Sequence, residues 1–206
     1  DLAAARTKNH EVGARWAATP QLDLGLTAFR TQFDNKLEFV NAATGFRNLG
    51  AARHQGAELE LKYRPQAVHG LELGAAYTLL DTEQETGAFR GNDLPYAPHR
   101  QLALDSTYRT GGWSWNLNGH YQSTMFSDGA NTPVENASGA VGPIPAYWLW
   151  NASVSHAFQW SGTRMKAALG VNNLFNRDYY FRGVDYSQGR MPQPGRALRV
   201  SLQVDL

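Results

Sequence analysis

The sequence predicts an all-β fold: an antiparallel up-and-down transmembrane β-barrel segment of about nine strands that is part of a larger barrel. Three observations predict it. Apolar and polar residues alternate with a period of two, short and long connections follow one another in turn, and tryptophans gather near the ends of the predicted strands. Such alternation is typical of a sheet with one apolar face and one polar face.

The composition excludes several other classes of protein. The 206 residues include 19 Lys+Arg and 18 Asp+Glu, so the formal net charge is +1 and no nucleic-acid partner is expected. The absence of cysteine excludes a disulfide scaffold and a Cys-ligated zinc protein. Aromatic residues make up 12% of the chain, too many for a disordered tail. The mean hydropathy of -0.47 and the lack of a long apolar run exclude a transmembrane helix.

The last predicted strand shows the alternation most clearly. Leu198, Val200, Leu202 and Val204 are apolar, and the residues between them are polar. A helix would scatter these apolar side chains around its circumference, whereas a strand places them on one face. The same alternation predicts nine strands, at 11–16, 22–29, 57–63, 71–79, 101–109, 113–122, 148–158, 165–172 and 198–206.

These strands suit a membrane barrel better than a soluble sandwich. Several run to about nine residues or more, the length that crosses a bilayer at a tilt. The face opposite the apolar one carries side chains such as Glu58, Lys62 and Asn116, which a polar lumen would solvate. Aromatic residues at strand ends are typical of the girdles of membrane barrels. The residues expected in the girdles are Trp16, Tyr63, Trp113, Trp115, Trp148 and Trp160.

The connections predict the topology. Short ones are expected at 19–21, 65–70, 110–112 and 159–163, and long ones at 34–50, 82–98, 127–145 and 178–195. In bacterial barrels short turns are periplasmic and long loops lie outside, so residue 1 is expected near the outer side and the C-terminus on the periplasmic side. Complete single-chain barrels have an even number of strands, so an odd number predicts the C-terminal part of a larger chain. The rival explanation is a miscounted strand, because Lys36–Val40 could pair within the first long loop or form an extra strand.

Four segments at the ends and in the middle of the chain carry a family resemblance. They are GVNNLFNRDYYFRG at 170–183, PGRALRVSLQVDL at 194–206, HQGAELELKYRP at 54–65 and GNDLPYAPHRQL at 91–102. They resemble, in turn, the near-terminal Asn-Leu-Phe segment, the closing strand, the Gly-x-Glu-Leu strand and the Leu-Pro-x-x-Pro loop ending of TonB-dependent outer-membrane receptors. The loop at 126–147 further resembles the ferric-citrate and siderophore branch of that family.

The resemblance implies a barrel of about 22 strands in the bacterial outer membrane, with a plug domain inside it. Residues 1–206 would be the C-terminal part of that barrel, with the plug domain absent. The implied partners are a ferric siderophore or ferric citrate, membrane lipid and lipopolysaccharide, and TonB through the missing N-terminal part. The chain departs from the family in its last residue, Leu206, where phenylalanine is usual.

Binding is expected rather than catalysis. The chain has no G-x-S-x-G, P-loop or G-x-G-x-x-G motif, and its six histidines lack metal-ligand spacing, so no enzyme, cofactor or metal is expected. Ferric chelates are often anionic, and a receptor would meet them with arginine forks, amides and aromatic rings. The candidate ligand-binding residues are Arg90, Asn92, His120, Gln122, Ser127, Asp128, Asn131, Tyr180, Arg182 and Arg190.

Alternatives stay open for the site and for the function. Arg182 leads the candidates because it follows the cluster Tyr179-Tyr180-Phe181, yet each candidate could instead be solvated or paired across the lumen. Asp128 to Asn131 could hold calcium, although the ligand spacing is incomplete. The alternative function is a small self-contained outer-membrane barrel of about eight to ten strands, acting as an adhesin or enzyme. A soluble β-protein with its tryptophans in a core is the third interpretation.

Leu202→Arg tests the assignment of the apolar face. An arginine near the midplane of the bilayer should impair assembly by about 2–4 kcal/mol, because its charge would meet hydrocarbon. The measurement is the yield of membrane-inserted barrel. Normal insertion of this variant would mean that the lipid-facing side is assigned to the wrong residues.

Overall fold

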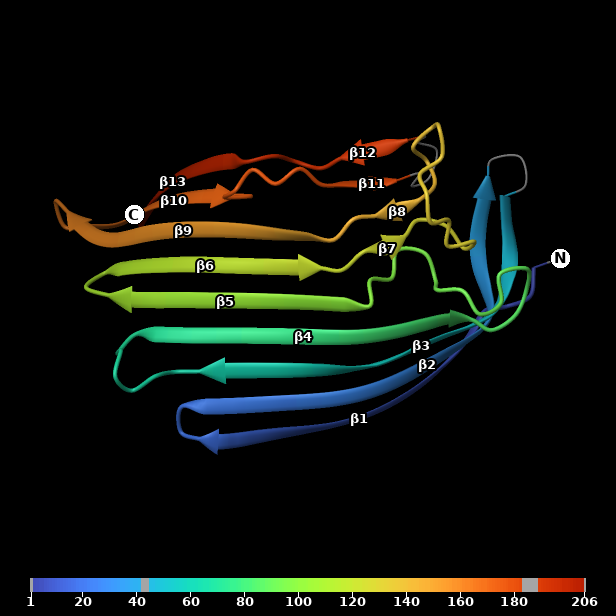
Figure 1. Cartoon of the computed structure of the whole chain (residues 1–206). Coiled ribbons are helices and arrows are strands. Elements are labelled where there is room, and N and C mark those ends of the chain that lie inside the picture. Colours follow the sequence, from blue (N-terminus) through green and yellow to red (C-terminus); the bar gives the residue numbers. More distant parts are fainter. Residues whose placement is uncertain (1, 42–44, 183–188, 206) are drawn as a thin grey trace.

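The computed structural model describes residues 2–41, 45–182 and 189–205, with the side chains of 36–41, 45–47 and 49 excepted. Nine strands form one antiparallel sheet in sequence order, which confirms the predicted meander (Figure 1). They are β1 (Arg6–Thr19), β2 (Leu22–Asn41), β3 (Gly45–Tyr63), β4 (Leu71–Gln84), β5 (Arg100–Thr110), β6 (Trp113–Gln122), β9 (Tyr147–Trp160), β10 (Thr163–Asn172) and β13 (Ala197–Asp205). No helix in the described part of the chain is long and apolar enough to cross a membrane.

The curved sheet is open, with β1 and β13 at its two edges. Short turns lie at one end of the strands and long loops at the other, as the connection lengths predict (Figure 1). β1 begins at the loop end and β13 finishes at the turn end. The predictions made for residue 1 and for Leu206 themselves lie outside the described residues.

The first long connection differs from its prediction. Residues 34–50 are expected as a loop, but β2 and β3 continue into this region and pair from Lys36 opposite Gly50 to Asn41 opposite Gly45. The segment 36–40 therefore pairs within the predicted loop and adds no strand to the sheet. The physical reason is visible in the sequence, where Leu37 and Phe39 alternate with charged neighbours and so continue the strand pattern.

Two of the short turns are tight two-residue hairpins. Thr110 pairs with Trp113 across Gly111 and Gly112, whose φ angles are 53° and 81°. Ser161 and Gly162 connect β9 to β10 with φ angles of 50° and 80°. Positive φ at both central residues defines the turn whose twist matches that of paired strands. These turns fix the register of β5 against β6 and of β9 against β10.

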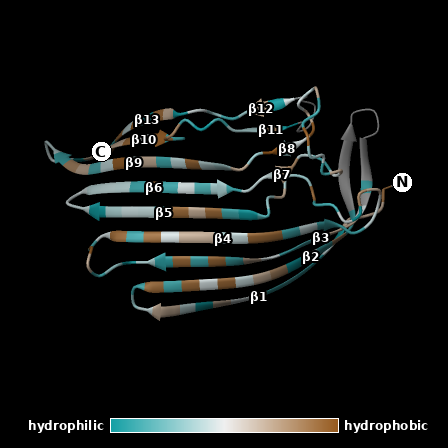
Figure 2. Ribbon diagram, viewed as in Figure 1, coloured by the Kyte–Doolittle hydropathy of each residue, from teal (hydrophilic) through white to brown (hydrophobic). Residues whose placement is uncertain are grey.

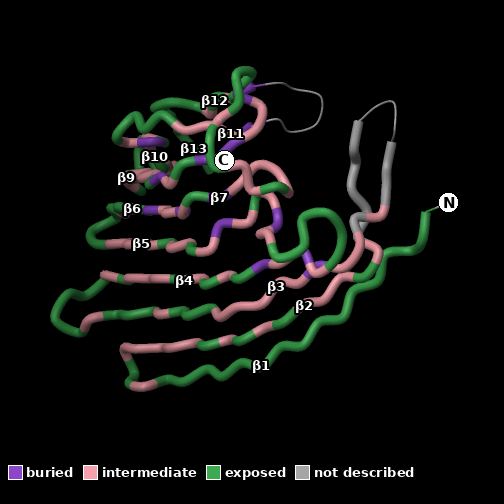
Figure 3. Tube along the Cα trace, turned by 45° about the vertical axis from the view of Figure 1, so that its right-hand side comes forward, coloured by how far each residue is buried: buried purple, intermediate pink, exposed green. Residues whose placement is uncertain are grey.

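The three remaining long connections are packed loops, and the last two of them contain small hairpins of their own. β7 (Met125–Phe126) pairs with β8 (Pro143–Ile144), and β11 (Tyr180–Arg182) pairs with β12 (Arg190–Pro192). Leu94 donates its backbone N–H to Thr82 Oγ1 at 3.0 Å, so these loops lie against the same face of the sheet as Thr82. Most residues coloured as buried in Figure 3 lie in the loops or at the strand ends next to them, and the buried apolar residues are among these. They are Ala52, Leu94, Met125, Ile144 and Tyr147.

Hydrophobic and hydrophilic residues alternate along the strands (Figure 2), and alternate residues of a strand point to opposite faces of the sheet. One row across the sheet joins Ala14, Leu26, Leu59 and Tyr77 in register. Leu26 and Leu59 are 55% and 48% exposed, so this face is not a core between two sheets, which is what the soluble alternative requires. The opposite face carries cross-strand polar pairs. Among them are Arg109–Glu72 at 2.9 Å, Arg64–Asp23 at 3.0 Å and Thr107–Asn116 at 2.9 Å.

Aromatic rings band the apolar face near both ends of the strands. At the turn end, Trp113 stacks on Trp115 and on His156, with ring centroids 5.7 and 4.2 Å apart. At the loop end, Trp148 contacts both Tyr121 and Trp150, at 5.2 and 5.5 Å. Rings at these two levels match the aromatic girdles that flank the apolar belt of a membrane barrel.

Gly56 sits where no side chain fits. A Cβ added to it would lie 2.1 Å from the backbone oxygen of Leu79 and 2.9 Å from Cζ of Phe29. Phe29 pairs with Gly56 across the sheet, so its ring fills the space that the glycine leaves. In contrast, a Cβ on Gly170 would meet only ordinary contacts at 3.8 Å or more.

Gly56→Ala is therefore expected to lower the free energy of unfolding by about 1–3 kcal/mol, because Phe29 and the strand backbone must shift. Gly170→Ala is the matched control, also a strand glycine, and is expected to be neutral. The measurement is urea unfolding of the protein in detergent micelles. Equal effects of the two substitutions would contradict the close approach at Gly56.

Candidate ligand-binding loops

Three loops cover the polar face at one end of the sheet, and nine of the ten candidate residues lie in them or at the strand end beneath them. We name them by position: the second loop is 85–99, the third is 123–146 and the fourth is 173–196, of which 183–188 lie outside the description. The three loops connect neighbouring antiparallel strands at the same end of the sheet, so residues that are distant in sequence lie close together there. The loops are therefore the part of the chain in which distant polar residues meet.

The second and third loops are joined through amide side chains. Asn131 accepts the backbone N–H of Asp93 at 2.7 Å through Oδ1 and donates to the carbonyl of Asp93 at 3.1 Å through Nδ2. Asn92 donates to the carbonyl of Gly129 at 3.1 Å, and Gln84 donates to the same oxygen at 2.8 Å. The predicted residues Asn92 and Asn131 thus come together, and both satisfy backbone groups of the neighbouring loop.

Asp128 organises a turn in the third loop. Its carboxylate accepts the backbone N–H groups of Ala130 and Thr132 and the hydroxyl of Thr132, at 3.0, 3.3 and 2.9 Å. Ser127 exchanges two hydrogen bonds with Gly142 across the loop, at 2.8 and 3.1 Å. In the described ranges, no group of three or more His, Cys, Asp or Glu side chains is placed to hold a metal ion.

Gln122 ends β6 beneath the third loop and is buried. Its Oε1 accepts the hydroxyl of Tyr147 at 3.1 Å, and its Nε2 points to the sulfur of Met125 at 3.4 Å. His120, two residues earlier on the same strand, is half-buried opposite Leu149 and Ala103. Arg90 is exposed in the second loop. In the part of the chain that the structure describes, no hydrogen bond joins His120 or Arg90 to another candidate.

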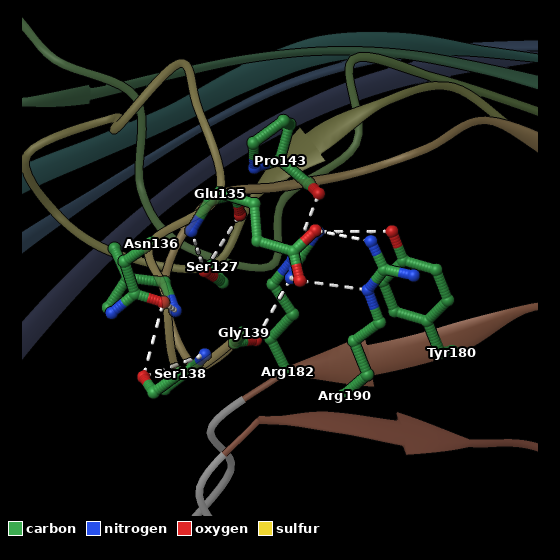
Figure 4. Close-up of polar contacts among 12 residues, drawn as sticks. Ser127, Glu135, Asn136, Ser138, Gly139, Pro143, Tyr180, Arg182 and Arg190 are labelled. Atoms are coloured by element: carbon green, nitrogen blue, oxygen red, sulfur yellow. Dashed lines mark hydrogen bonds and ion pairs between the residues drawn. The ribbon is translucent and has the colours of Figure 1, made fainter.

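Glu135 ties the third loop to the fourth. Its carboxylate accepts Arg190 Nε at 2.8 Å and a second Arg190 nitrogen, and it also accepts Arg182 NH2 at 3.2 Å (Figure 4). Both guanidinium groups lie against the ring of Tyr180, 4.9 Å from its centroid for Arg182 and 4.8 Å for Arg190. We call Glu135, Tyr180, Arg182 and Arg190 the loop clasp.

The two arginines of the loop clasp have different surroundings. The Arg182 side chain is 2% exposed and also donates to the carbonyls of Pro143 and Gly139, at 3.0 and 2.9 Å. The Arg190 side chain is 54% exposed. Arg182 therefore holds the loops together, whereas Arg190 presents part of its guanidinium to solvent. Direct ligand contact by either residue stays a prediction.

The charge of Glu135 is stabilised by both arginines. Hydrogen bonds from Arg190 and then from Arg182 lower the pKa of Glu135 from 4.5 to about 2. The same contact with Glu135 raises the pKa of Arg190. Because the pKa of Glu135 is lowered in the folded state, its ion pairs stabilise the loops fully above about pH 4.5. That contribution is lost as the pH falls toward about 2.

A family model decides where this chain belongs. Residues 1–174 match the model described as TonB dependent receptor-like, beta-barrel. The chain belongs to the TonB-dependent receptor β-barrel family. Membership confirms the resemblance carried by the sequence motifs and the fold class, and it places the chain in the bacterial outer membrane. The family is one of receptors and not of enzymes.

Several proteins are similar to this receptor barrel segment. The iron-regulated outer membrane virulence protein of Vibrio cholerae serotype O1 is 26% identical over 223 residues, which cover 99% of this chain and 31% of the relative. The ferric citrate transporter FecA, solved in its unliganded form, is 28% identical with a TM-score of 0.81, over 96% of this chain and 30% of FecA. The ferric yersiniabactin uptake receptor FyuA from Yersinia pestis shares the fold, with 21% identity and a TM-score of 0.74 over 97% of this chain and 29% of FyuA. The chain thus spans about a third of the length of these proteins.

Several residues on which the loops of this family member depend were not among the predicted candidates. Glu135 is the centre of the loop clasp. Gln84 donates its backbone N–H to the carbonyl of Asn92, and Asp93 and Tyr147 bond to Asn131 and Gln122. No spacing rule marks Glu135, because its partners lie 47 and 55 residues away. One signal was available: Glu135 lies in a loop otherwise poor in carboxylates, opposite a loop with two candidate arginines.

Titration of Glu135 tests the loop clasp. The carboxylate is expected to protonate near pH 2, and Arg190→Ala should move the midpoint up toward 4.5 because that arginine makes the largest contribution. The measurement is the ¹³C chemical shift of the Glu135 carboxyl carbon in labelled receptor. A Glu135 midpoint near 4.5 in the parent protein would contradict the shared ion pair.

Proposed function

We propose that this chain is the C-terminal part of the barrel of a receptor that takes up a ferric siderophore or a ferric-citrate-like chelate with energy from TonB. The observation that carries the proposal is the likeness to the ferric citrate transporter FecA, over 96% of the chain at a TM-score of 0.81. The name of the Vibrio cholerae relative, an iron-regulated outer membrane protein, supports the same class of substrate.

The loops provide chemistry that suits an anionic chelate. Arg190 offers a half-exposed guanidinium, and Tyr180 offers a ring and a hydroxyl beside it. Arg90 adds an exposed cation, and His120 adds a half-buried imidazole. Arginine forks bind carboxylates with two parallel hydrogen bonds, as Arg190 already does with Glu135. Arg190 and Tyr180 are therefore our first candidates for direct contact.

The other predicted residues support the site in this proposal. Five of them use their polar atoms on neighbouring loop or strand groups: Asn92, Gln122, Ser127, Asp128 and Asn131. Arg182 is saturated by loop carbonyls and Glu135. We assign these six residues the role of holding the loops in shape around the chelate.

The remaining partners are part of the same proposal. A plug domain and the TonB contact would be supplied by the portion of the receptor that corresponds to the rest of its relatives, and the barrel would be surrounded by membrane lipid and lipopolysaccharide. We assign no enzymatic activity to the chain. The alternative, a small self-contained barrel acting as an adhesin or enzyme, is not favoured because the chain spans only 30% of FecA while following its fold.

Arg190→Ala in the full receptor should weaken binding of ferric citrate or the cognate chelate by about tenfold or more, because a charge-assisted hydrogen bond is lost. The measurement is equilibrium binding of the radiolabelled ferric chelate. Arg109→Ala is the matched control, since Arg109 is also exposed, at 58%, and is paired with Glu72 at the turn end of the sheet.

Glu135→Gln separates direct contact from loop shape. If Arg190 binds the chelate, removing the competing carboxylate should leave affinity unchanged or raise it. If Arg190 acts only by holding the loop clasp, Glu135→Gln should weaken binding as Arg190→Ala does. If the parent receptor and the Arg190→Ala variant bind the chelate with equal affinity, Arg190 is not part of the binding site.

A further inference from the structure

A basic strip lies on the apolar face directly beyond its last apolar row. That row is formed by Val12, Ala28, Ala57 and Leu79, which pair in register across β1 to β4. The next row toward the loop end begins with His10 opposite Arg30. Alternate residues of a strand share a face, so these two side chains continue the apolar face of the sheet. The chemistry of this face therefore changes from apolar to basic within two residues.

Three side chains make up the basic strip: Lys8, His10 and Arg30. His10 and Arg30 are direct cross-strand partners, and Lys8 is the next residue of β1 on the same face, opposite Gln32. Side chains in such positions have Cβ atoms about 4.5–5.5 Å apart when directly opposite and about 7–8 Å apart on the diagonal. All three side chains are exposed, as is β1 along most of its length (Figure 3).

The nearby acids do not neutralise the basic strip. Asp34 stands opposite Arg6, one row further toward the loops. Asp81 lies in the row of His10 and Arg30, but its carboxylate accepts Gln55 at 2.9 Å and Arg53 at 3.4 Å. Neither Lys8 nor Arg30 forms an ion pair in the described part of the chain. Basic side chains placed opposite and diagonal to one another repel, and a bound anion would offset that repulsion.

The position of the basic strip on the sheet indicates which kind of anion would bind to it. The strip adjoins the apolar belt at its loop end, which in bacterial barrels faces outward, so it lies at the level of the outer-leaflet headgroups. The anions at that level belong to lipid headgroups, whose acyl chains would pack against the apolar rows beneath. We propose that Lys8, His10 and Arg30 bind the phosphate groups of lipopolysaccharide. Arginine contributes a fork of donors and lysine a point charge, both suited to phosphate. This inference rests on the proposed outer-membrane receptor but not on its chelate.

The test is lipid A binding by the full receptor carrying Lys8→Gln and Arg30→Gln. Each cation near an anionic lipid surface contributes roughly fivefold to binding, so the double variant should bind lipid A about 30-fold more weakly. The measurement is native mass spectrometry of the detergent-solubilised receptor titrated with lipid A. Lipid A stripped of its phosphates should bind the parent receptor as weakly as intact lipid A binds the variant.

The matched control is Arg15→Gln with Lys62→Gln, which removes the same charge from the polar face of β1 and β3. It should bind lipid A like the parent. Unchanged binding by the Lys8/Arg30 variant, or an equal loss in the control, would overturn the proposal. Circular dichroism should show that both variants are folded. Chelate binding should be intact in the Lys8/Arg30 variant. If the chelate proposal is wrong, the parent receptor will also fail to bind the chelate, and the measurement of lipid A binding is unaffected by that result.

Discussion

The pairing of backbone groups between neighbouring strands is the constraint on which the rest of this structure depends. In hydrocarbon there is no water to satisfy a free N–H or C=O, so every strand must pair with its neighbours. Pairing in fixed register sends alternate side chains to opposite faces, and one residue of slip would exchange the two faces completely. The row from Ala14 to Tyr77 and the ion pair between Arg109 and Glu72 are two results of that single register.

The sheet follows from the sequence because its signals are local. Alternation in the last strand, Gly111-Gly112 and Ser161-Gly162 each act within a few residues, and each correctly predicts the element in which it lies. The prediction of a loop for the first long connection was wrong. The polar composition of this segment resembles a loop, although Leu37 and Phe39 continue the alternation of a strand. Composition and periodicity were therefore in conflict there, and periodicity determined the structure.

The site was less predictable because its contacts are distant in sequence. Polar loop residues were correctly expected to gather at one end of the barrel, yet their partners could not be assigned. Asn131 meets Asp93 from 38 residues away, and Arg182 meets Glu135 from 47 residues away. Such pairs depend on the order of strands and on loop packing, which composition does not encode. Arg182, the leading candidate for ligand contact, is buried because its long side chain reaches three groups of the third loop.

The contacts between the loops also determine how the outer end of the barrel responds to a ligand. The β2–β3 hairpin is bonded to the second loop through Ala51 and Thr86, the second loop to the third through Asn131, and the third to the fourth through Glu135. Hydrogen bonds and ion pairs, some to side chains and some to the backbone, therefore connect each loop to the next. Loops connected in this way are preorganised, so the capture of a ligand requires little additional ordering of the loops.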